Sequence, residues 1–459
     1  MPRKRTLIRG MIWLTMAALC MAGSVSVMKA ILPDADGYVA CRYNGDGPSF
    51  EMVKTLRANM AESAEDKKAD GTVTAWAQEQ KARVTCKELL SSVEADVLWV
   101  DGAARQIWPW KEAGGSLPVF DTARVCAVDA KTARLLFGST DILGQKVEIS
   151  GITYEVVCVF ELPGGISSWA ADPGNGLILC PAAALAEPPP VQAVDFDIMP
   201  RDTKTPKEWT DAWLNDSRVP QPAWIDAISQ RHRLLTLVAE CGPILLALFI
   251  LWDLGRAVLG LLRGTASEAK TCWSDRSLPA SRGWRIWALG LAGASLLGLL
   301  AMWAASLARI SLDVPPDYLP TRWSDLSFWP TLAREAAEEY AARRMTGALR
   351  PDMVYTHLCN LSAAFSLVAV PLLGLARHDL RCACAGGSPP RMGITFFCGI
   401  ASVPLALWCV QQMGFPPAAP YGMFPLTVIF IAVVQFVEGY PPAKLLTTYI
   451  HKNQEEVSL

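Results

Sequence analysis

The sequence has few charged residues for its length. Of 459 residues, 19% are Asp, Glu, Lys or Arg, against about 25% in an ordinary soluble protein. Lys and Arg number 42 and Asp and Glu number 44, so the formal net charge is −2. This balance argues against a basic nucleic-acid-binding protein, and we expect no nucleic-acid partner. Because 51% of the residues are hydrophobic, the composition also excludes a disordered chain.

Motifs for catalysis are also missing. There is no Gly-x-x-x-x-Gly-Lys-Ser/Thr phosphate loop, so any ATP hydrolysis that drives this protein must belong to a separate subunit. The chain has no His-Glu-x-x-His and no Gly-x-Ser-x-Gly. It therefore lacks the motifs of two common classes of hydrolase. We therefore expect no enzymatic activity, no catalytic residues and no cofactor in this chain.

Histidine is scarce, whereas cysteine is abundant but scattered. The chain has four His and 13 Cys. The spacing His378-x-x-x-Cys382-x-Cys384 offers three ligands where zinc usually takes four, so we expect no metal site. Five cysteines fall in the segment that we expect outside the membrane: Cys41, Cys86, Cys126, Cys158 and Cys180. Both one or two disulfides and buried free thiols remain open for them.

Long apolar runs are the main positive feature of the sequence. Six stretches approach the ~20 apolar residues that cross a bilayer as a helix. They are residues 10–27, 234–252, 284–307, 361–376, 394–413 and 423–437. The first is longer than the apolar part of a usual signal peptide, which favours an uncleaved anchor over a cleaved leader. Small residues at Gly290, Gly293 and Gly298 suit close helix packing, either within the chain or in a dimer.

The basic segments that flank these stretches all fall on one side of a six-span chain. The N-terminus, the segments after the second and fourth stretches, and the C-terminal tail all carry Lys or Arg. The positive-inside rule places these four segments, and hence both termini, in the cytoplasm. Residues 256–285 form the most basic segment, a predicted loop that contains Arg256, Arg263, Arg276 and Arg282, with Trp273 and Trp284 as possible anchors. The loop is either a contact for an ATPase or only a determinant of topology.

The segment before the second stretch has the pattern of a folded α/β domain. Its clearest block lies at 123–160, where apolar periodicity predicts strand 124–129, helix 130–137, strand 142–149 and strand 152–160. Gly138 follows the helix as a C-terminal cap would. Ser150 and Gly151 separate the last two strands and predict a tight hairpin turn.

This block resembles the core of the periplasmic domain in MacB-like, FtsX-type ABC transporter permeases. The residues at matching positions are Ala133, Leu136, Phe137, Gly138, Gly144, Val147, Gly151, Tyr154, Val156, Val157 and Val159. Of these, the expected structural residues of the motif are Phe137, Gly138, Gly144, Gly151 and Tyr154. Cys158 stands where the family usually has Gly, the family generally has four transmembrane helices, and its Glu-Ile-Gly-x-x-Arg-Ala-x-Gly signature is absent from the basic segment.

The resemblance implies an α-helical integral membrane protein with an extracytoplasmic α+β domain inserted between the first and second transmembrane helices. The expected parts are 1–32, the cytoplasmic N-terminus and first helix; 33–230, the outside domain; 231–309, helices two and three with the basic loop; 310–358, an outside loop with a charged helix; and 359–459, helices four to six and a cytoplasmic tail. We expect a helical stalk at 225–237 to lead into the second helix.

The resemblance also implies a function and partners. The chain would be a permease subunit in a bacterial plasma or inner membrane, paired with an ABC-type ATPase subunit, as a homodimer or a permease heterodimer. ATP hydrolysis by the partner would move the outside domain and so export or extract a substrate. The alternative is a membrane-anchored sensor or assembly protein without transport activity.

Overall fold

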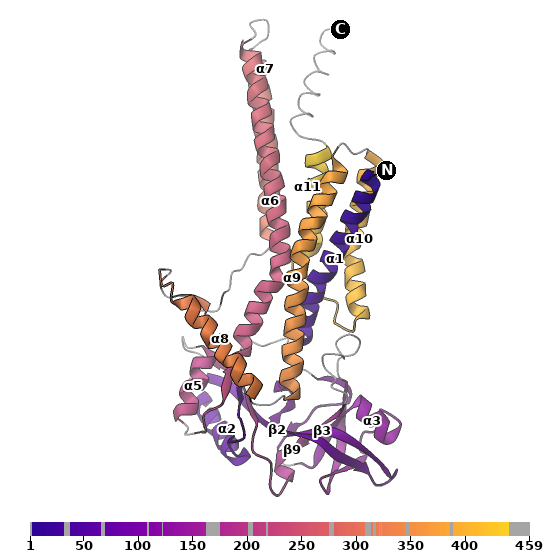
Figure 1. Ribbon diagram of the computed structural model, residues 1–459, viewed down its shortest axis with the longest axis vertical. Coiled ribbons are helices and arrows are strands. Elements are labelled where there is room, and N and C mark those ends of the chain that lie inside the picture. The colour runs from indigo at the N-terminus through magenta and orange to yellow at the C-terminus, as the bar shows by residue number, and fades with distance from the viewer. Residues whose placement is uncertain are drawn as a thin grey trace.

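Figure 1 shows a computed structural model in which a β-rich domain lies at one end of a bundle of long helices. It describes residues 2–31, 37–65, 69–107, 110–121, 123–161, 175–200, 205–216, 219–274, 280–307, 314, 318–320, 322, 324–345, 349–385 and 389–439.

Within the described residues, eleven strands form one mixed sheet. They are β1 (Tyr38–Arg42), β2 (Ala69–Cys86), β3 (Ser91–Ala103), β4 (Lys111–Gly115), β5 (Val119–Phe120), β6 (Val125–Asp129), β7 (Lys146–Ile149), β8 (Ile152–Glu161), β9 (Gly176–Pro181), β10 (Ala193–Pro200) and β11 (Trp224–Asp226). The order across the sheet is β11-β1-β10-β2-β7-β8-β6-β9-β3-β5, and β4 pairs with β8. The pairs β3–β9 and β6–β8 are parallel.

Apolar side chains cover both faces of the sheet. On one face, helices α2 (Phe50–Glu65), α3 (Ala130–Phe137) and α5 (Pro206–Asp216) add residues such as Leu56, Leu136 and Leu214 to the core. The core on the other face includes Leu349, which directly precedes the longest helix of the C-terminal half. The domain core is therefore continuous with the start of the helical bundle.

The bundle contains the apolar stretches of the sequence. Its helices are α1 (Pro2–Ile31), α6 (Ile228–Ser274), α7 (Ala280–Leu307), α9 (Arg350–Cys384), α10 (Pro389–Gln412) and α11 (Met423–Gly439), and α8 (Phe328–Met345) lies beside the domain. Among the described residues, α1, α6, α7, α9 and α10 are long and apolar enough to cross a membrane, whereas α11 is apolar but shorter. An α+β domain with several apolar helices agrees with the coarse fold class expected from the sequence.

The block at 123–160 folds as its pattern predicts, with one shift. Asp129 caps α3 by accepting a hydrogen bond from the Thr132 backbone N–H, and Gly138 ends the helix at φ +71°. Ser150 (φ +49°) and Gly151 (φ +78°) supply the two positive φ angles of the hairpin turn. The strand expected from 142 begins only at Lys146, because residues before it form a turn in which Gly144 (φ +79°) donates its N–H to the Val156 carbonyl at 2.8 Å.

The basic segment at 256–285 differs from the expected loop. α6 continues without a break to Ser274, and α7 has already begun at Ala280. The stalk expected at 225–237 also merges with this element, since β11 ends at Asp226 and α6 begins at Ile228. One helix of 47 residues, about 70 Å long at 1.5 Å per residue, replaces a stalk, a span and most of a loop.

Candidate functional site at the junction of sheet and helices

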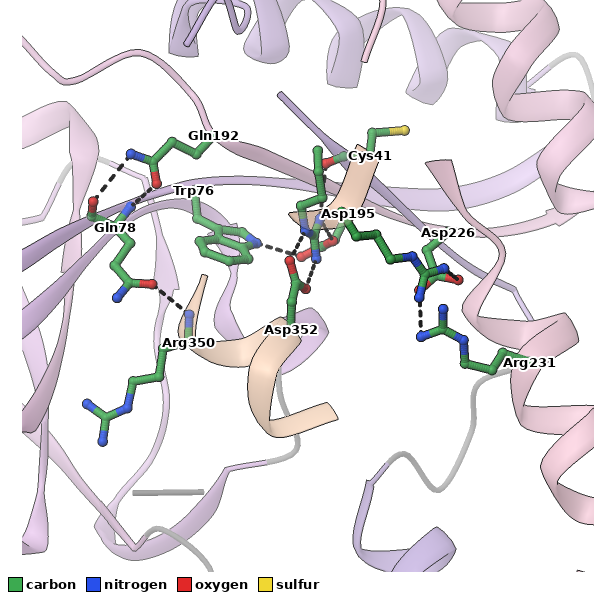
Figure 2. Close-up of polar contacts among 11 residues, drawn as sticks. Cys41, Trp76, Gln78, Gln192, Asp195, Asp226, Arg231, Arg350 and Asp352 are labelled. Atoms are coloured by element: carbon green, nitrogen blue, oxygen red, sulfur yellow. Dashed lines mark hydrogen bonds and ion pairs between the residues drawn. The ribbon is translucent and has the colours of Figure 1, made fainter. Parts of the chain in front are cut away.

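Arg42 is the centre of a buried charge cluster where the sheet meets the helices. It stands at the end of β1 and is 3% exposed. Its Nη1 donates to Asp195 Oδ1 on β10 at 2.6 Å, and its Nε and Nη2 donate to both carboxylate oxygens of Asp352 on α9 at 2.6 and 2.7 Å. Trp76 donates from Nε1 to the other Asp195 oxygen at 2.6 Å (Figure 2). One guanidinium therefore ties two strands to the first turn of α9.

Arg350 forms a second link between α9 and the domain. Its backbone N–H donates to the Gln78 side-chain oxygen at 2.8 Å (Figure 2). Its Nη1 and Nη2 donate to the carbonyls of Gly176 and Asn175 at 3.0 and 2.9 Å, and its Nη1 lies 3.7 Å from Asp96 Oδ2. The N-terminus of α9 is thus held by β2 and β9 as well as by β1.

Asp226 links the domain to α6 and α8. It is the last residue of β11, two residues before α6 begins. Its carboxylate lies 3.0 Å from Nη1 of Arg231 on α6 and 3.3 Å from Nη2 of Arg343 on α8. Arg343 also pairs with Glu339 at 2.6 Å and stacks 4.8 Å from the ring centroid of Trp224. We call Arg42, Asp195, Asp226, Arg231, Arg343, Arg350 and Asp352 the junction.

The electrostatics of the junction make it sensitive to the loss of any member. Burial raises the pKa of Asp195 from its ordinary value, and Arg42 and the Trp76 donor oppose that rise. Burial likewise raises the pKa of Asp226, and Arg231 opposes it. Removing one partner of such a buried pair leaves an uncompensated charge, which is strongly destabilising. The junction therefore joins the sheet to three helices through buried charges that depend on one another.

A second charge cluster lies at the C-terminal end of α9 and just past the middle of α6. Arg377 on α9 donates to Asp253 on α6 at 2.7 Å, and Arg381 on α9 donates to Glu438 on α11 at 2.7 Å. Arg256 contacts both acids, at 3.1 Å from Asp253 and 3.3 Å from Glu438. We call these five residues the distal cluster. It ties α6, α9 and α11 together far from the sheet.

The predicted coupling arginines are only partly brought together. Arg256 belongs to the distal cluster, and Arg263 is exposed about two turns further along α6. Arg282 lies in the first turns of α7, and Arg276 lies outside the described residues. Trp273 and Trp284, at the end of α6 and the start of α7, are exposed and their rings lie 5.6 Å apart.

The motif residues hold the domain fold and lie away from the junction. Phe137 packs against the domain core at the end of α3, and Gly138, Gly144 and Gly151 each have a positive φ at a turn. Tyr154 on β8 is fully buried, with its ring centroid 6.3 Å from that of Trp99. These residues specify the sheet rather than a binding site.

The cysteines of the domain are free and buried. All five, from Cys41 to Cys180, are thiols without a disulfide. In the part of the chain that the structure describes, no group of three or more His, Cys, Asp or Glu residues is placed to hold a metal. His378 Nε2 lies 3.9 Å from the exposed Cys382 sulfur, whereas Cys384 is buried on another face of α9.

Sequence reasoning missed most of the junction. Arg42 and Asp195 are charged residues inside short apolar runs, Val39-Ala-Cys-Arg42 and Val194-Asp-Phe196. That pattern is a usable signal, because charged side chains in buried strands are almost always paired. The identity of the partners, such as Asp352 some 310 positions away, is a property of the tertiary fold alone.

Comparison with known proteins finds similarity in the part of the chain that contains the β-rich domain. The family model of the MacB-like periplasmic core domain matches residues 6–213. The match confirms the resemblance of this part of the chain to the MacB-like periplasmic core domain. No curated protein matches the chain.

Two solved structures are similar to part of the chain. The periplasmic region of MacB from Actinobacillus actinomycetemcomitans has 12% identity and a TM-score of 0.30, and the alignment covers 42% of this chain and 89% of that one. The extracellular domain of the noncanonic ABC-type transporter YknZ from Gram-positive bacteria has 15% identity and a TM-score of 0.28, covering 40% of this chain and 97% of that one.

Proposed function

We propose that this chain is the permease subunit of an ABC transporter, and that a separate ATPase subunit moves its extracytoplasmic domain through the helices. The MacB-like domain supports the transporter family. Because the sequence has no phosphate loop, the proposal assigns ATP hydrolysis to a separate subunit. Under this proposal the domain lies outside the membrane between the first two spans, α1 and α6, and both chain termini lie in the cytoplasm.

The single observation that carries the proposal is the spacing of the two charge clusters along two helices. Arg231 and Arg256 are 25 residues apart on α6, and Asp352 and Arg377 are 25 residues apart on α9. At 1.5 Å per residue both spacings are about 38 Å. A bilayer has a hydrocarbon core of about 30 Å and a total thickness of about 40–45 Å. The junction and the distal cluster therefore match the two surfaces of one membrane.

The continuity of α6 is the observation from which we infer mechanical transmission rather than a pore. α6 is continuous from the junction, through the distal cluster, to the exposed tryptophan pair at Trp273 and Trp284. The hairpin that α6 and α7 form extends beyond the ends of α9 and α11 (Figure 1). A displacement of this hairpin by an ATPase is passed along the single helix α6, which includes Pro243, to Asp226 and hence to the sheet.

The test is co-purification from native membranes. A tagged chain should carry with it a protein that contains a phosphate-loop motif, and the Trp273→Ala/Trp284→Ala double variant should lose most of that protein, because aromatic anchors dominate protein interfaces. Trp329→Ala is the matched control, since Trp329 is about half exposed on α8 beside the domain and should leave the association unchanged.

The outcome that contradicts the proposal is equally defined. If no phosphate-loop protein accompanies the tagged chain in mild detergent, the protein is a sensor or assembly protein instead. If an ATPase is present but the double variant retains it, the ATPase binds elsewhere and the hairpin is not the coupling element.

A further inference from the structure

Three members of the distal cluster, Arg377, Arg381 and Glu438, line a cavity that the proposed coupling does not use. The cavity has a volume of about 430 Å³ and lies between α6, α9 and α11. The residues that give it its chemistry are Phe249, Arg377, His378, Arg381 and Glu438. It combines cationic walls with one aromatic ring, which is the composition of a site for an amphipathic anion.

The charges around the cavity leave a positive excess. Arg256, Arg377 and Arg381 face two carboxylates, Asp253 and Glu438. Three cations against two anions leave one positive charge even with His378 neutral. An additional single negative charge would neutralise the site. A dianion fits less well, because Glu438 lines the same cavity.

Arg381 has the donors that such an anion needs. Its Nε is taken by Glu438 at 2.7 Å. Among the described residues, no acceptor contacts its two terminal nitrogens, and its side chain is 30% exposed. Arg377 is held differently: Nε and Nη2 both donate to Asp253, and its guanidinium carbon lies 4.6 Å from the Phe249 ring centroid. The Arg377 side chain is thus held in place, whereas Arg381 has terminal nitrogens available to donate hydrogen bonds.

The position of the cavity selects the kind of anion. It lies about 38 Å along α9 from the junction, at the depth of a second membrane surface. Leu375 on α9 and Trp252 on α6 are large, exposed and apolar near the same level, as side chains that face acyl chains and the interface are. Basic pockets between helices at this depth suit lipid head groups.

We propose that this cavity binds the head group of an anionic phospholipid, with the phosphodiester on Arg381 and the neighbouring positive wall of Arg377. The inference rests on the proposed function in one respect, because it takes the distal cluster to lie at the cytoplasmic surface of the membrane. Occupation would fill the space between α9, α11 and the part of α6 from which the coupling hairpin extends, so the lipid would stiffen the base of that hairpin.

The test uses the full chain in nanodiscs of phosphatidylcholine that contain an equal minor fraction of phosphatidylglycerol or of phosphatidylethanolamine. Native mass spectrometry after release counts the lipids that stay bound. We expect phosphatidylglycerol to be retained at least tenfold over phosphatidylethanolamine, and Arg381→Gln to remove that preference. Arg263→Gln is the control, because Arg263 is an exposed arginine of α6 outside the cavity and should retain it.

A second variant and a soluble anion complete the test. His378 lines the same cavity, and it forms no ion pair among the described residues. His378→Asn should therefore weaken lipid retention without unfolding the bundle. Equal retention of both lipids, or full retention in Arg381→Gln, would overturn the inference. A third contradictory outcome is that inorganic phosphate, at low millimolar concentration in detergent, binds the protein and abolishes the retention of phosphatidylglycerol. The ligand would then be a soluble anion. ATPase co-purification is measured separately, so its failure leaves the lipid result interpretable.

Discussion

At the scale of single residues, the strongest constraints in this molecule are charges that are buried in pairs. Asp195 accepts from both Arg42 and Trp76 and is almost inaccessible. Asp195→Asn would leave Arg42 with one acid fewer in a dry site. We expect a loss of about 3–5 kcal/mol in the free energy of unfolding, the range for breaking a buried pair, measured by urea denaturation of the detergent-solubilised protein.

The control for that variant is an exposed ion pair with a similar distance between its charged atoms. Lys111 and Glu161 lie 2.8 Å apart on the surface of the domain. Glu161→Gln should change the free energy of unfolding by less than about 1 kcal/mol, as surface pairs do. Equal effects of the two variants would show that the junction charges are solvated.

The domain thiols provide a second prediction at this scale. Burial raises the pKa of Cys158 to about 11, and the other four domain cysteines are also buried. Since the thiolate is the reactive form, we expect no modification of these five by a maleimide at pH 7 until the domain is unfolded, whereas the exposed Cys382 reacts at once. Peptide mass spectrometry distinguishes the sites, and an intramolecular disulfide found among the five would contradict the structure.

What the sequence predicts about residues depends on how local the cause is. Gly138 and Gly151 were predictable, because a helix end and a two-residue hairpin each demand a positive φ within a few positions. Arg42 was not, because its partners on β10 and α9 are brought to it only by the complete fold. Phe137 and Tyr154 were identified through the family motif, and both serve the core of the domain.

At the scale of elements, α6 and α7 form the part of the bundle that leaves the rest. The sequence left open whether the small residues of α7 serve this chain or a dimer. A Cβ on Gly290 would lie 2.5 Å from Thr265 Cγ2, and one on Gly293 would lie 3.1 Å from Leu261 Cδ2, whereas Gly298 has open space. The first two therefore pack against α6 of the same chain.

Two alanine substitutions test this packing. Gly290→Ala should destabilise the α6–α7 hairpin by about 1–3 kcal/mol, the usual effect of overpacking. Gly298→Ala meets no atom and should be neutral or slightly stabilising, because Ala favours helix over Gly by up to about 1 kcal/mol. Limited proteolysis near residue 275 reports the opening of the hairpin. Faster cleavage in Gly298→Ala than in Gly290→Ala would contradict this assignment.

The elements that sequence patterns missed are the short ones. β1 and β11 have five and three residues, too few for a periodic signal to stand out. They nevertheless carry Arg42 and Asp226, the residues that join the sheet to the helices. The 256–285 segment was interpreted as a loop because basic residues follow an apolar run, yet Arg and Lys are good helix formers and α6 continues through them.

At the scale of the whole molecule, two charge clusters and two long helices connect a folded domain to a hairpin at the opposite end. Neither cluster alone specifies a function. Their common spacing of 25 residues on α6 and α9 is what relates the domain, the membrane and the hairpin. A movement at one end should therefore be transmitted to the other, and that transmission is measurable.

The most direct measurement is the distance between the two ends, by double electron–electron resonance. Spin labels are placed at Leu135→Cys on α3 and Lys270→Cys on α6, both exposed. Cys272, two residues from Lys270 in the sequence, is replaced first, as are Cys241, Cys382 and Cys398, which are exposed. With the co-purified ATPase in nanodiscs, we predict that ATP shifts the distance distribution and that Asp352→Asn abolishes the shift while ATP is still hydrolysed. An unchanged distribution in the parent protein during ATP hydrolysis would contradict the account.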